Sequence, residues 1–340
     1  NQQMAEQVCV MGAGSWGTTL ARMLAVNGHS VRLHCHPPEI ADGIRETRHN
    51  PLYFPEVELP AGIEPHTDLA AALDGAGVAY LVIPTRFLRE FFAENGDALE
   101  RWDSAERVIC NCTKGLLLDP TQRTDQWLKQ TLPRAKLVHL AGPNLAAELM
   151  AGHPAAAVAA GDAVSARMVQ DQLMSGQYRV YTGPDTVGVE VAGFYKNIIA
   201  IAAGAVDTLG LGDNTKSVLI TRGLAEMGRL VEYFGGDERT LSGLAGIGDL
   251  VTTCAGNKSR NFQVGMRRAQ GQSLAQILDE MTQVAEGITA VQAVKQWPGE
   301  HGLSGWPELP IADEVYRFVH EGCEPGESIS RLMHRPPKAE

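Results

Sequence analysis

The fold is decided by the stretch Val8-Cys9-Val10-Met11-Gly12-Ala13-Gly14-Ser15-Trp16-Gly17, an apolar run that leads directly into a Gly-x-Gly-x-x-Gly turn. A helical pattern follows at once over residues 18–26. In such a strand–turn–helix, the first glycine permits the tight bend and the second lets backbone approach a pyrophosphate. The third glycine lets the helix pack closely on the strand. The helix N-terminus offers free N–H groups and a positive dipole end to phosphates, so the pattern predicts a dinucleotide site at Gly12, Gly14 and Gly17.

The second predicted strand, residues 31–34, bears on which dinucleotide is held. NAD-specific sites usually place an Asp or Glu at about this position, where the carboxylate binds the ribose 2′-hydroxyl. Here the strand is followed by Cys35-His36-Pro37, and the first carboxylate is Glu39. No anion repels a 2′-phosphate, and His36 or Arg32 could attract one. We therefore expect a site for NADP(H) or NAD(H), with NADP(H) slightly favoured.

The composition of the whole chain excludes several classes of protein. Its 340 residues are enough for two domains, and 44% hydrophobic and 20% charged residues are typical of a globular protein. The formal net charge of -11 argues against nucleic acid and anionic membranes as partners. We find no signal peptide and no apolar run long enough to span a bilayer, so we expect a cytoplasmic protein. The six cysteines have no metal-ligand spacing, which predicts buried, reduced thiols and no metal.

Strand and helix patterns alternate through the first half of the chain. Strands are predicted at residues 8–11, 31–34, 78–83, 108–111, 137–140, 156–159 and 179–181, with helices at 18–26, 87–98, 121–130 and 163–174. Such alternation predicts an α/β fold with a Rossmann-type, doubly wound parallel sheet. The segment 50–65 carries four prolines and predicts a loop.

From about residue 187 the pattern becomes helical, with helices predicted at 187–209, 215–234, 259–269, 273–281 and 288–296. The domain boundary is expected near Gly183-Pro184-Asp185. We therefore expect a dinucleotide-binding domain over residues 1–185, an all-α substrate-binding domain over 186–335, and a frayed tail over 336–340.

Three predicted strands end in turn residues, where doubly wound sheets bind ligands. These ends are Ile83-Pro84-Thr85, Cys112-Thr113-Lys114-Gly115 and Ala141-Gly142-Pro143-Asn144. Lys114 is a lone cation followed by glycine, which favours a ligand contact over a solvated surface lysine.

Lys196 lies within an apolar helical pattern. The residues that share its helix face are mostly small: Val189, Ala192, Gly193, Ile199, Ala200 and Ala203. A long cationic side chain among small neighbours indicates a helix face that opens onto a cleft. Desolvation and a second cation such as Lys114 would lower the pKa of this lysine, so that it could exchange a proton with a substrate hydroxyl near neutral pH. The alternative is a lysine that extends its ammonium to solvent.

A third candidate lies in the glycine-rich segment 243–253 and the polar segment that follows it. No strand precedes these glycines, so we expect a loop that folds closely over a ligand rather than a second dinucleotide turn. Ser259 is placed to cap a helix that begins with Arg260 and Asn261, and Arg260 would present a bidentate donor to a phosphate. A capped helix with a surface arginine is the alternative.

Together these pieces resemble the bacterial-type glycerol-3-phosphate dehydrogenase [NAD(P)+] family across essentially the whole chain. Besides the first turn, the matching blocks are Thr113-Lys114-Gly115, Gly142-Pro143, residues 196–201, residues 221–227, residues 246–250, Ser259-Arg260-Asn261 and Glu286-Gly287.

The resemblance implies hydride transfer between C2 of sn-glycerol 3-phosphate and a nicotinamide, with dihydroxyacetone phosphate as the ketone, for glycerophospholipid synthesis. It also implies a homodimer. Lys196 would be the general base or acid, with Lys114 and Asp249 beside it as catalytic residues. The implied cofactor contacts are Ser15, Trp16, His36, Lys114, Ala146, Arg260, Val284 and Glu286. The implied substrate contacts are Lys114, Gly142, Asn144, Lys196, Asn197, Asp249, Thr253, Ser259, Arg260 and Asn261.

Two departures from the family pattern leave the substrate open. The family usually has Ser-Gly-Pro followed by Thr or Ser where this chain has Ala141-Gly142-Pro143-Asn144, and smaller residues in place of Phe194-Tyr195. A same-family enzyme for a different small phosphorylated hydroxyketone is therefore an alternative. A catalytically inactive cofactor-binding regulator is a second one, against which the intact set of Lys114, Lys196, Asp249 and Arg260 argues.

Overall fold

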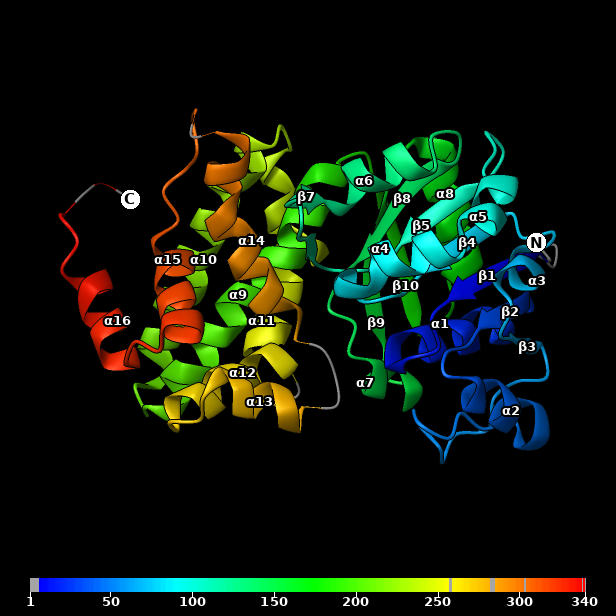
Figure 1. Ribbon diagram of the computed structural model, residues 1–340, viewed down its shortest axis with the longest axis horizontal. Helices are drawn as coiled ribbons and strands as arrows, with labels where there is room; N and C mark the ends of the chain where they lie inside the picture. Colours follow the sequence, from blue (N-terminus) through cyan, green and yellow to red (C-terminus); the bar gives the residue numbers. More distant parts are fainter. Residues whose placement is uncertain (1–5, 257–258, 282–284, 303, 338, 340) are drawn as a thin grey trace. The chain divides into compact units, whose positions relative to one another are not determined.

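The computed structural model describes residues 6–256, 259–281, 285–302, 304–337 and 339, which fold into two compact units (Figure 1). The first unit contains Asn1–Thr113 and Asp125–Thr186, and the second contains Lys114–Thr124 and Val187–Glu340. The last crossing between them falls at residues 186–187, beside the boundary expected from the sequence. The segment Lys114–Thr124 groups with the second unit, although the sequence pattern assigned it to the first domain.

An eight-stranded sheet forms the centre of the first unit, in the order β10-β9-β8-β5-β4-β1-β2-β3. Its strands are β1 (Gln7–Met11), β2 (Ser30–His34), β3 (Ile63–His66), β4 (Val78–Leu81), β5 (Val108–Asn111), β8 (Lys136–Ala141), β9 (Ala155–Ala160) and β10 (Tyr178–Gly183). This Rossmann-like, mainly parallel topology confirms the predicted fold class, and each predicted strand is present within a few residues of its expected bounds.

The sheet differs from the prediction at two places. β8 and β9 pair antiparallel, because the only helix between them, α7 (Ala146–Met150), is far too short to carry the chain back along the sheet. The expected loop over residues 50–65 ends early, in the edge strand β3. Pro65 is tolerated there because an edge strand has a neighbour on one side only, and β3 pairs with β2 alone.

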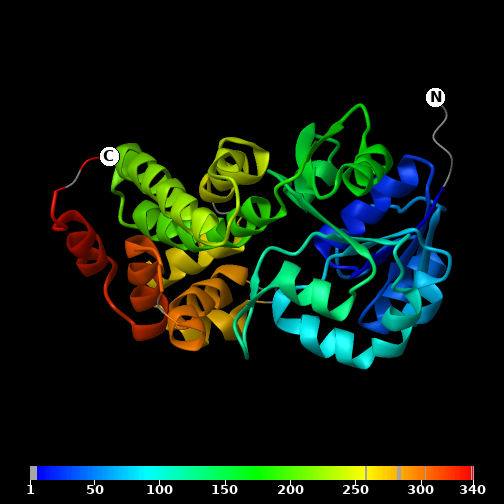
Figure 2. The ribbon, with the colours of Figure 1, turned by 90° about the horizontal axis from the view of Figure 1, so that it is seen from above.

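Helices cover both faces of this sheet, with α1 and α8 on one face and α4, α5 and α6 on the other (Figure 2). They are α1 (Ser15–Val26), α2 (Pro38–Thr47), α3 (Leu69–Leu73), α4 (Thr85–Glu94), α5 (Gly96–Trp102), α6 (Thr124–Thr131), α7 and α8 (Ala163–Leu173). The helix predicted over 87–98 is two helices that meet at Asn95. α2 was not predicted, although Pro38 at its first turn and the buried stripe of Ile40, Ala41 and Ile44 are helix signals.

The second unit is helical, as predicted. Its helices are α9 (Thr186–Thr208), α10 (Gly212–Tyr233), α11 (Asp249–Cys254), α12 (Arg260–Ala269), α13 (Leu274–Glu280), α14 (Glu286–His301), α15 (Pro310–Tyr316) and α16 (Pro325–Met333). Three short helices, η1 (Glu238–Ser242), η2 (Leu244–Gly248) and η3 (Arg317–Glu321), and a two-stranded ladder of β6 (Leu116–Leu117) and β7 (Gln122–Arg123) complete it.

The glycine-rich segment at 243–248 is helical, which corrects the predicted loop. η2 runs directly into α11 and bends at Gly246, whose backbone is not helical. A Cβ on Gly246 would lie 2.2 Å from the carbonyl oxygen of Leu241, so glycine is required where η1 and η2 meet. These glycines therefore position the start of α11 and its first residue, Asp249.

The central helix of the second unit is α9. It is long and apolar enough to cross a membrane by length and composition, which corrects the expectation that no run reaches that length. However, 94% of its most apolar window is buried inside the protein, as in the core helix of a globular domain. Its side chains form the centre of the second hydrophobic core.

Candidate functional site

The nucleotide turn, residues 12–17 between β1 and α1, has the geometry that its glycines predict. Gly12 has a φ of +110°, and a Cβ on it would lie 2.7 Å from the carbonyl oxygen of Val82. A Cβ on Gly17 would lie 1.8 Å from the carbonyl oxygen of Gly12. The tight bend and the close helix–strand packing expected from the sequence are confirmed.

The same turn leaves its helix N-terminus uncapped by a side chain. The N-cap of α1 is Gly14, and among the described residues no atom lies within 4 Å of the position that its Cβ would take. Ser15 and Trp16, the first residues of the helix, are half-buried. Backbone N–H groups that lack a side-chain cap suit the binding of a pyrophosphate, so this turn fits a dinucleotide.

Asn50 braces the turn and was missed by the sequence analysis. It is fully buried, and its Nδ2 donates to the Ala13 carbonyl at 3.0 Å and to the Thr18 hydroxyl at 2.9 Å. Its Oδ1 accepts from the backbone N–H groups of Leu52 and Tyr53, both at 3.1 Å. The asparagine in front of the proline-rich segment was a possible turn signal, but only the fold places it against Ala13.

At β2, the structure corrects the expectation that Arg32 could attract a 2′-phosphate. Arg32 donates to the backbone carbonyls of Ala71 at 2.9 Å and Asp74 at 2.6 Å, and lies 3.9 Å from the Glu64 carboxylate. These contacts turn its guanidinium to the C-terminal end of α3, so in this conformation Arg32 does not serve a 2′-phosphate. His36 is exposed after the strand, and this leaves it as the candidate at that position.

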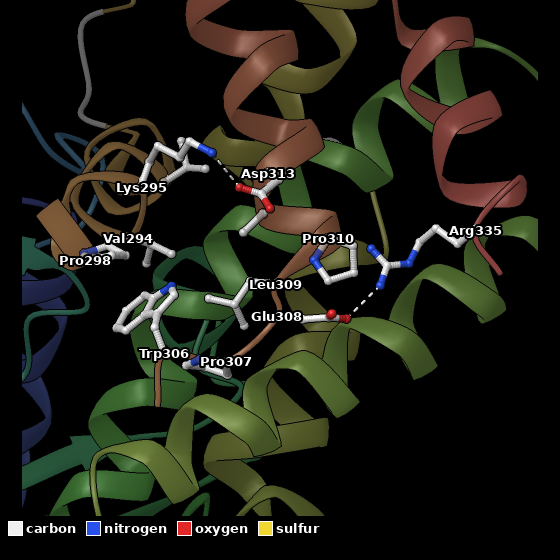
Figure 3. A pocket seen from close by; sticks show the side chains of 12 residues that line it. Val294, Lys295, Pro298, Trp306, Pro307, Glu308, Leu309, Pro310, Asp313 and Arg335 are labelled. Carbon is white, nitrogen blue, oxygen red and sulfur yellow. Dashed lines mark hydrogen bonds and ion pairs between the residues drawn. The ribbon is translucent and has the colours of Figure 1, made fainter. Parts of the chain in front are cut away.

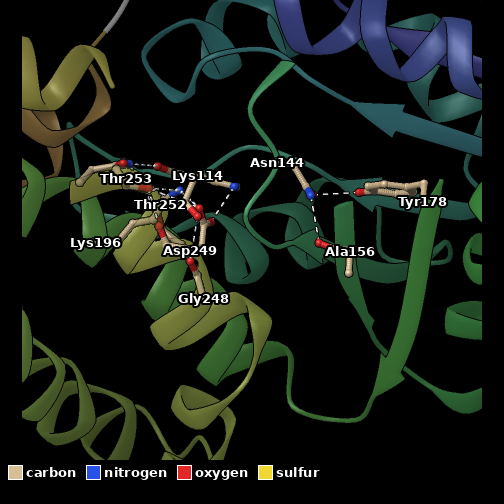
Figure 4. Close-up of polar contacts among 11 residues, drawn as sticks. Lys114, Asn144, Ala156, Tyr178, Lys196, Gly248, Asp249, Thr252 and Thr253 are labelled. Carbon is tan, nitrogen blue, oxygen red and sulfur yellow. Dashed lines mark hydrogen bonds and ion pairs between the residues drawn. The ribbon is translucent and has the colours of Figure 1, made fainter. Parts of the chain in front are cut away.

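Gly142 and Asn144 follow β8 and make contacts that the sequence did not reveal, and Figure 4 shows those of Asn144. A Cβ on Gly142 would lie 2.6 Å from the Ala156 carbonyl oxygen, so glycine permits a close approach of two backbones. Asn144 Nδ2 donates to that same carbonyl at 2.9 Å, and its Oδ1 accepts from the Tyr178 hydroxyl at 2.8 Å. Asn144 therefore joins β8, β9 and β10, and Ala146 begins α7 two residues later.

The second unit contains a group that we call the lysine cluster: the buried Lys196, Asp249 and Thr253 and the half-buried Lys114 (Figure 4). Lys196 Nζ donates to Asp249 Oδ1 at 2.5 Å and to the Thr253 hydroxyl at 3.1 Å. Lys114 Nζ donates to the other carboxylate oxygen of Asp249 at 2.8 Å. Lys196 is only 6% exposed, which rejects the alternative of a lysine that extends to solvent.

The charges of the cluster are set by burial and by one another. Burial disfavours the charged form of Lys196, and the nearby Lys114 ammonium repels it, so that its pKa falls to about 8 in spite of the opposing pull of Asp249. Burial disfavours ionisation of Asp249, but the two ammonium groups outweigh it and hold the pKa of that carboxyl below its usual value. The predicted tuning of Lys196 by desolvation and by Lys114 is thus supported.

Asn197 holds the backbone of Lys114. Its Nδ2 donates to the Lys114 carbonyl at 3.1 Å, in addition to a longer contact of 3.4 Å with the Gly193 carbonyl. Gly193 lies under the aliphatic stem of Lys114, because a Cβ there would be 3.6 Å from Lys114 Cγ. Two residues of α9 thus position Lys114 beside Lys196.

The N-terminus of α12 begins as predicted. Ser259 is its N-cap, and the serine hydroxyl accepts from the Phe262 N–H at 3.3 Å. Arg260 is exposed at the first helical position. The Asn261 side chain is buried and accepts from the Gly287 N–H at 2.8 Å, which ties α12 to the start of α14 beside the half-buried Glu286. Val284 lies outside the described residues.

The predicted site residues are therefore divided between the two units. The first unit holds the nucleotide turn, His36, Gly142, Asn144 and Ala146, while the second holds the lysine cluster, Asn197, Ser259, Arg260, Asn261 and Glu286.

Tyr195 has a structural role that its place beside Lys196 did not suggest. It is fully buried, and its hydroxyl donates to Glu226 Oε2 at 2.7 Å. The same carboxylate accepts from the backbone N–H groups of Ile311 at 2.6 Å and Ala312 at 3.3 Å, at the start of α15. Burial raises the pKa of Glu226. The bulky residue before Lys196 thus faces a buried polar network, away from solvent.

A pocket of about 390 Å³ lies between α14 and the chain that leads into α15 (Figure 3). Trp306, Leu309 and Val294 give it an apolar lining. The ion pairs Lys295–Asp313 and Arg335–Glu308, each at 2.8 Å, lie at its edge. None of its lining residues belongs to the predicted site.

Comparison with known proteins identifies the same family over both parts of the chain. The family model of the NAD-dependent glycerol-3-phosphate dehydrogenase N-terminus matches residues 7–166, and that of the C-terminus matches residues 185–330. The chain is 42% identical to the glycerol-3-phosphate dehydrogenase [NAD(P)+] of Moorella thermoacetica, over 98% of this chain and 97% of the relative. It is also 42% identical to that of Geobacter metallireducens, over 99% of both chains.

The fold agrees with this similarity. The crystal structure of glycerol-3-phosphate dehydrogenase from Coxiella burnetii superposes with a TM-score of 0.90 at 34% identity, and the match covers 98% of this chain and 100% of the other.

Proposed function

The chain belongs to the glycerol-3-phosphate dehydrogenase [NAD(P)+] family, and we propose that Lys196 is the residue that exchanges the proton in its active site. The enzyme is an oxidoreductase that acts on a CH–OH group and interconverts sn-glycerol 3-phosphate and dihydroxyacetone phosphate with NAD(H) or NADP(H). The nicotinamide, when bound, accepts or supplies the hydride at C2. The protein must therefore hold the phosphate, orient C2 and move one proton.

A single observation carries the assignment of Lys196: it is a buried lysine whose pKa lies close to neutral pH. With a pKa of about 8, both its neutral and protonated forms are present under physiological conditions. In the oxidising direction the neutral amine takes the proton of the C2 hydroxyl, and in the reducing direction the ammonium returns it to the forming alkoxide. A lysine at its ordinary pKa of 10.5 would hardly ever be neutral at pH 7.

Asp249 and Lys114 complete this proton-exchange group. Asp249 fixes the Nζ of Lys196 in one place, and the Thr253 hydroxyl, at 3.1 Å, gives that nitrogen a second partner. Lys114, on the other oxygen of the carboxylate, supplies a positive charge that favours the alkoxide as it develops. We assign Asn197 the role of ordering Lys114 and the substrate hydroxyls.

We assign the phosphate of the substrate to the N-terminus of α12. Arg260 supplies a bidentate cation there, Ser259 and Asn261 flank it, and the helix N-terminus adds its positive dipole end. Gly142 and Asn144 stay proposed substrate contacts through the backbone of their turn, since the Asn144 amide is engaged with Ala156 and Tyr178.

The nucleotide turn would hold the cofactor. Gly12, Gly14 and Gly17 shape it, and Ser15 and Trp16 begin the helix that faces the pyrophosphate. We propose His36, Ala146, Arg260, Val284, Glu286 and Lys114 as further cofactor contacts. With Arg32 engaged elsewhere, a preference for NADP(H) rests on His36 and on the missing carboxylate after β2.

The two departures from the family pattern do not favour another substrate. Tyr195 is fully buried and bonded to Glu226, and the side chain of Asn144 is bonded within its own sheet. We also propose a cytoplasmic homodimer that supplies glycerol 3-phosphate for lipid synthesis, with residues 1–185 as the dinucleotide domain and 186–335 as the substrate domain. The net charge of -11 favours a small-molecule substrate over nucleic acid.

The test is the Lys196→Met variant, assayed with dihydroxyacetone phosphate and with NADPH and NADH in parallel. We expect kcat to fall by about 10²–10⁴-fold while the affinity for the reduced cofactor, measured by its fluorescence, is unchanged. Lys295→Met is the control, because it removes a half-exposed lysine of the same unit whose partner is Asp313. Turnover above a tenth of the wild-type value in Lys196→Met would exclude the assigned role, and no turnover of dihydroxyacetone phosphate by the wild type would exclude the substrate.

A further inference from the structure

The segment Lys114–Thr124, which we call the strap, leaves the first unit and packs with the second before the chain returns. Its sequence neighbours on both sides, Thr113 and Asp125, belong to the first unit. Lys114, which lies at one end of the strap, is therefore carried by the helical unit. Its position depends on how firmly that unit holds the whole segment.

The Lys114 end of the strap is held by α9 and α11. Asn197 donates to the Lys114 carbonyl at 3.1 Å, and the Lys114 ammonium donates to Asp249 at 2.8 Å. The Thr124 hydroxyl donates to the Gly115 carbonyl at 3.0 Å, which closes the strap on itself. These contacts fix the backbone next to Lys114, and its side chain, with four rotatable bonds, forms an ion pair with Asp249 at its tip.

The middle of the strap is anchored by burial. Leu116 and Leu117 are 1% and 2% exposed, and Leu116 belongs to the hydrophobic core of the second unit, in which β6 packs on α14. The apolar anchor fixes where the strap lies. It does not fix the rotation of the segment about its own length, since apolar contacts are not directional.

The far end of the strap is held by directional bonds to the last turn of α14. Thr121 is fully buried, and its N–H and hydroxyl donate to Glu300 Oε2 at 2.8 and 2.7 Å. The Thr121 carbonyl lies 2.8 Å from His301 Nε2. Arg123 adds an ion pair with Glu190 of α9 at 3.2 Å. Glu300 is exposed, yet one of its carboxylate oxygens, Oε2, accepts two hydrogen bonds from the buried Thr121.

We propose that Glu300 and Thr121 are positioning residues of the active site, which hold the strap in the rotation that keeps the Lys114 ammonium on Asp249 beside Lys196. The effect of this positioning on catalysis rests on the proposed function, in which Lys196 exchanges the proton. The contacts that hold the strap do not depend on the proposed function. Neither residue touches the lysine cluster, so both act through Lys114.

Release of the strap is expected to change the pKa of Lys196 in one direction. The charged and titratable groups that act on Lys196 among the described residues are Asp249 and Cys254 of α11 and Lys114 of the strap. Lys114 repels the charge on Lys196 and occupies half of the Asp249 carboxylate. If Lys114 moves away, the repulsion is lost and Asp249 is left to Lys196 alone, so the pKa of Lys196 rises.

The experiment compares Glu300→Ala, which removes the acceptor and the charge, with Glu300→Gln, which keeps an acceptor and removes only the charge. The pKa of Lys196 is read from an NMR titration of lysine side chains in the full-length enzyme, with the resonance assigned by Lys196→Arg. We expect Glu300→Ala to raise this pKa by about half a unit to one unit, so that kcat/KM for glycerol 3-phosphate oxidation falls about three- to tenfold at pH 7 and recovers above pH 9. Thr121→Val should act in the same direction and more weakly, because its backbone N–H still bonds Glu300.

The matched pair separates positioning from simple electrostatics. Loss of a negative charge at a distance lowers a lysine pKa, so Glu300→Gln should leave the pKa of Lys196 unchanged or slightly lowered. In a Lys114→Met background, Glu300→Ala should cause no further shift, because no Lys114 ammonium is left to position.

Equal shifts in Glu300→Ala and Glu300→Gln, or a shift that persists in Lys114→Met, would overturn the proposal. So would an unshifted pKa in a folded Glu300→Ala variant. If Lys196 proved not to be catalytic, Glu300→Ala would still raise the pKa of Lys196, but kcat/KM would not change with it. That pattern would contradict the proposed function and leave the positioning role of Glu300 intact.

Discussion

The nucleotide turn of the first unit is made of backbone, whereas the lysine cluster of the second unit is made of buried side chains. The turn needs only six consecutive residues, and Gly12 and Gly17 are required in it because other atoms occupy the space of a Cβ at those two positions. The cluster joins Lys114 of the strap and Lys196 of α9 to Asp249 and Thr253 of α11, and these three segments are far apart in the sequence. The first is a local structure, and the second exists only once the helical unit has folded.

This difference decides how each region fails. A turn of this kind tolerates the removal of a side chain, since its binding groups are main-chain N–H groups. It is damaged when a side chain is added at one of its glycines. In the cluster the carboxylate is the critical group, because removal of Asp249 leaves two ammonium groups without their shared partner. We therefore expect the nucleotide turn to be damaged by added side chains and the lysine cluster to be damaged by the loss of a charge.

The largest effect is expected for Asp249→Asn in the lysine cluster. The change keeps the shape and removes the charge between two ammonium groups, so we expect the free energy of unfolding to fall by about 3–5 kcal/mol. Without the attraction of Asp249 the pKa of Lys196 should fall further below 8. Denaturant unfolding and a pH–rate profile measure both. A variant of wild-type stability would mean that the carboxylate is not the partner of both lysines.

In the nucleotide turn, Gly17→Ala and Gly14→Ala should have different outcomes. Gly17→Ala places a methyl group 1.8 Å from a carbonyl oxygen, so we expect a loss of stability of about 1–3 kcal/mol or more, together with weaker cofactor binding. Gly14→Ala meets no described atom within 4 Å, so the fold should be unaffected while cofactor affinity falls. Thermal unfolding and cofactor titration separate the two. Equal losses of stability would contradict the idea that Gly14 is kept for the ligand.

Arg260→Ala tests the phosphate site at the start of α12. Loss of charge-assisted hydrogen bonds, each about 1.5–3 kcal/mol, should raise KM for dihydroxyacetone phosphate about 10–100-fold with a smaller change in kcat. Arg267→Ala, two turns along the same helix and paired with Glu280, is the control. If both variants raise KM alike, the effect is general electrostatic attraction and Arg260 is not a specific contact.

The wild-type pH profile follows from the pKa of Lys196. The pKa is lowered from 10.5 to about 8, and oxidation of glycerol 3-phosphate needs the neutral amine. Its rate should thus rise about tenfold per pH unit up to an inflection near 8, whereas reduction of dihydroxyacetone phosphate should decline above that inflection. Steady-state rates from pH 6 to 10 measure this. Profiles with the same slope in both directions would rule out a single group that serves as base and acid.

The smallest effect is expected for Asn144→Thr, which restores the residue type usual in the family. The bonds to Ala156 and Tyr178 would be lost or weakened, so stability should fall by about 1 kcal/mol. KM should change less than twofold, because the amide is already bonded within the sheet. A large gain or loss of affinity for dihydroxyacetone phosphate would show that Asn144 reaches the substrate after all.

Elements that depend on interactions between neighbouring residues were predicted more accurately than elements that depend on contacts between distant segments. Elements set by local periodicity, such as β5, α8 and α9, lie within one residue of their predicted bounds. Apart from α2, whose helix signals are local, the errors lie where tertiary contacts decide: β3 forms because β2 offers it an edge, and η2 bends at Gly246 where η1 packs against it. The antiparallel pairing of β8 with β9 likewise depends on a connection that is too short for a crossover.

For the site, the identities of the charged residues could be inferred from the sequence, but their partners could not. Lys196 stood out because of its apolar helix, and Ser259 and Arg260 because of the capping pattern. Nothing local indicated that Arg32 would bind the C-terminal end of α3, that Asn50 would brace the turn, or that Tyr195 would bond Glu226. Each of these contacts spans 30 or more residues of sequence.

The sequence by itself determined the nucleotide turn, the helical second half and the residues that carry charge into its core. It could do so because strand, turn and helix signals act over a few neighbouring residues. Only the tertiary structure decided that Lys114 leaves the sheet with the strap, and that it shares Asp249 with Lys196. The reason is physical: a buried ammonium acquires its pKa from the charges that surround it, and those charges come together only when distant segments pack.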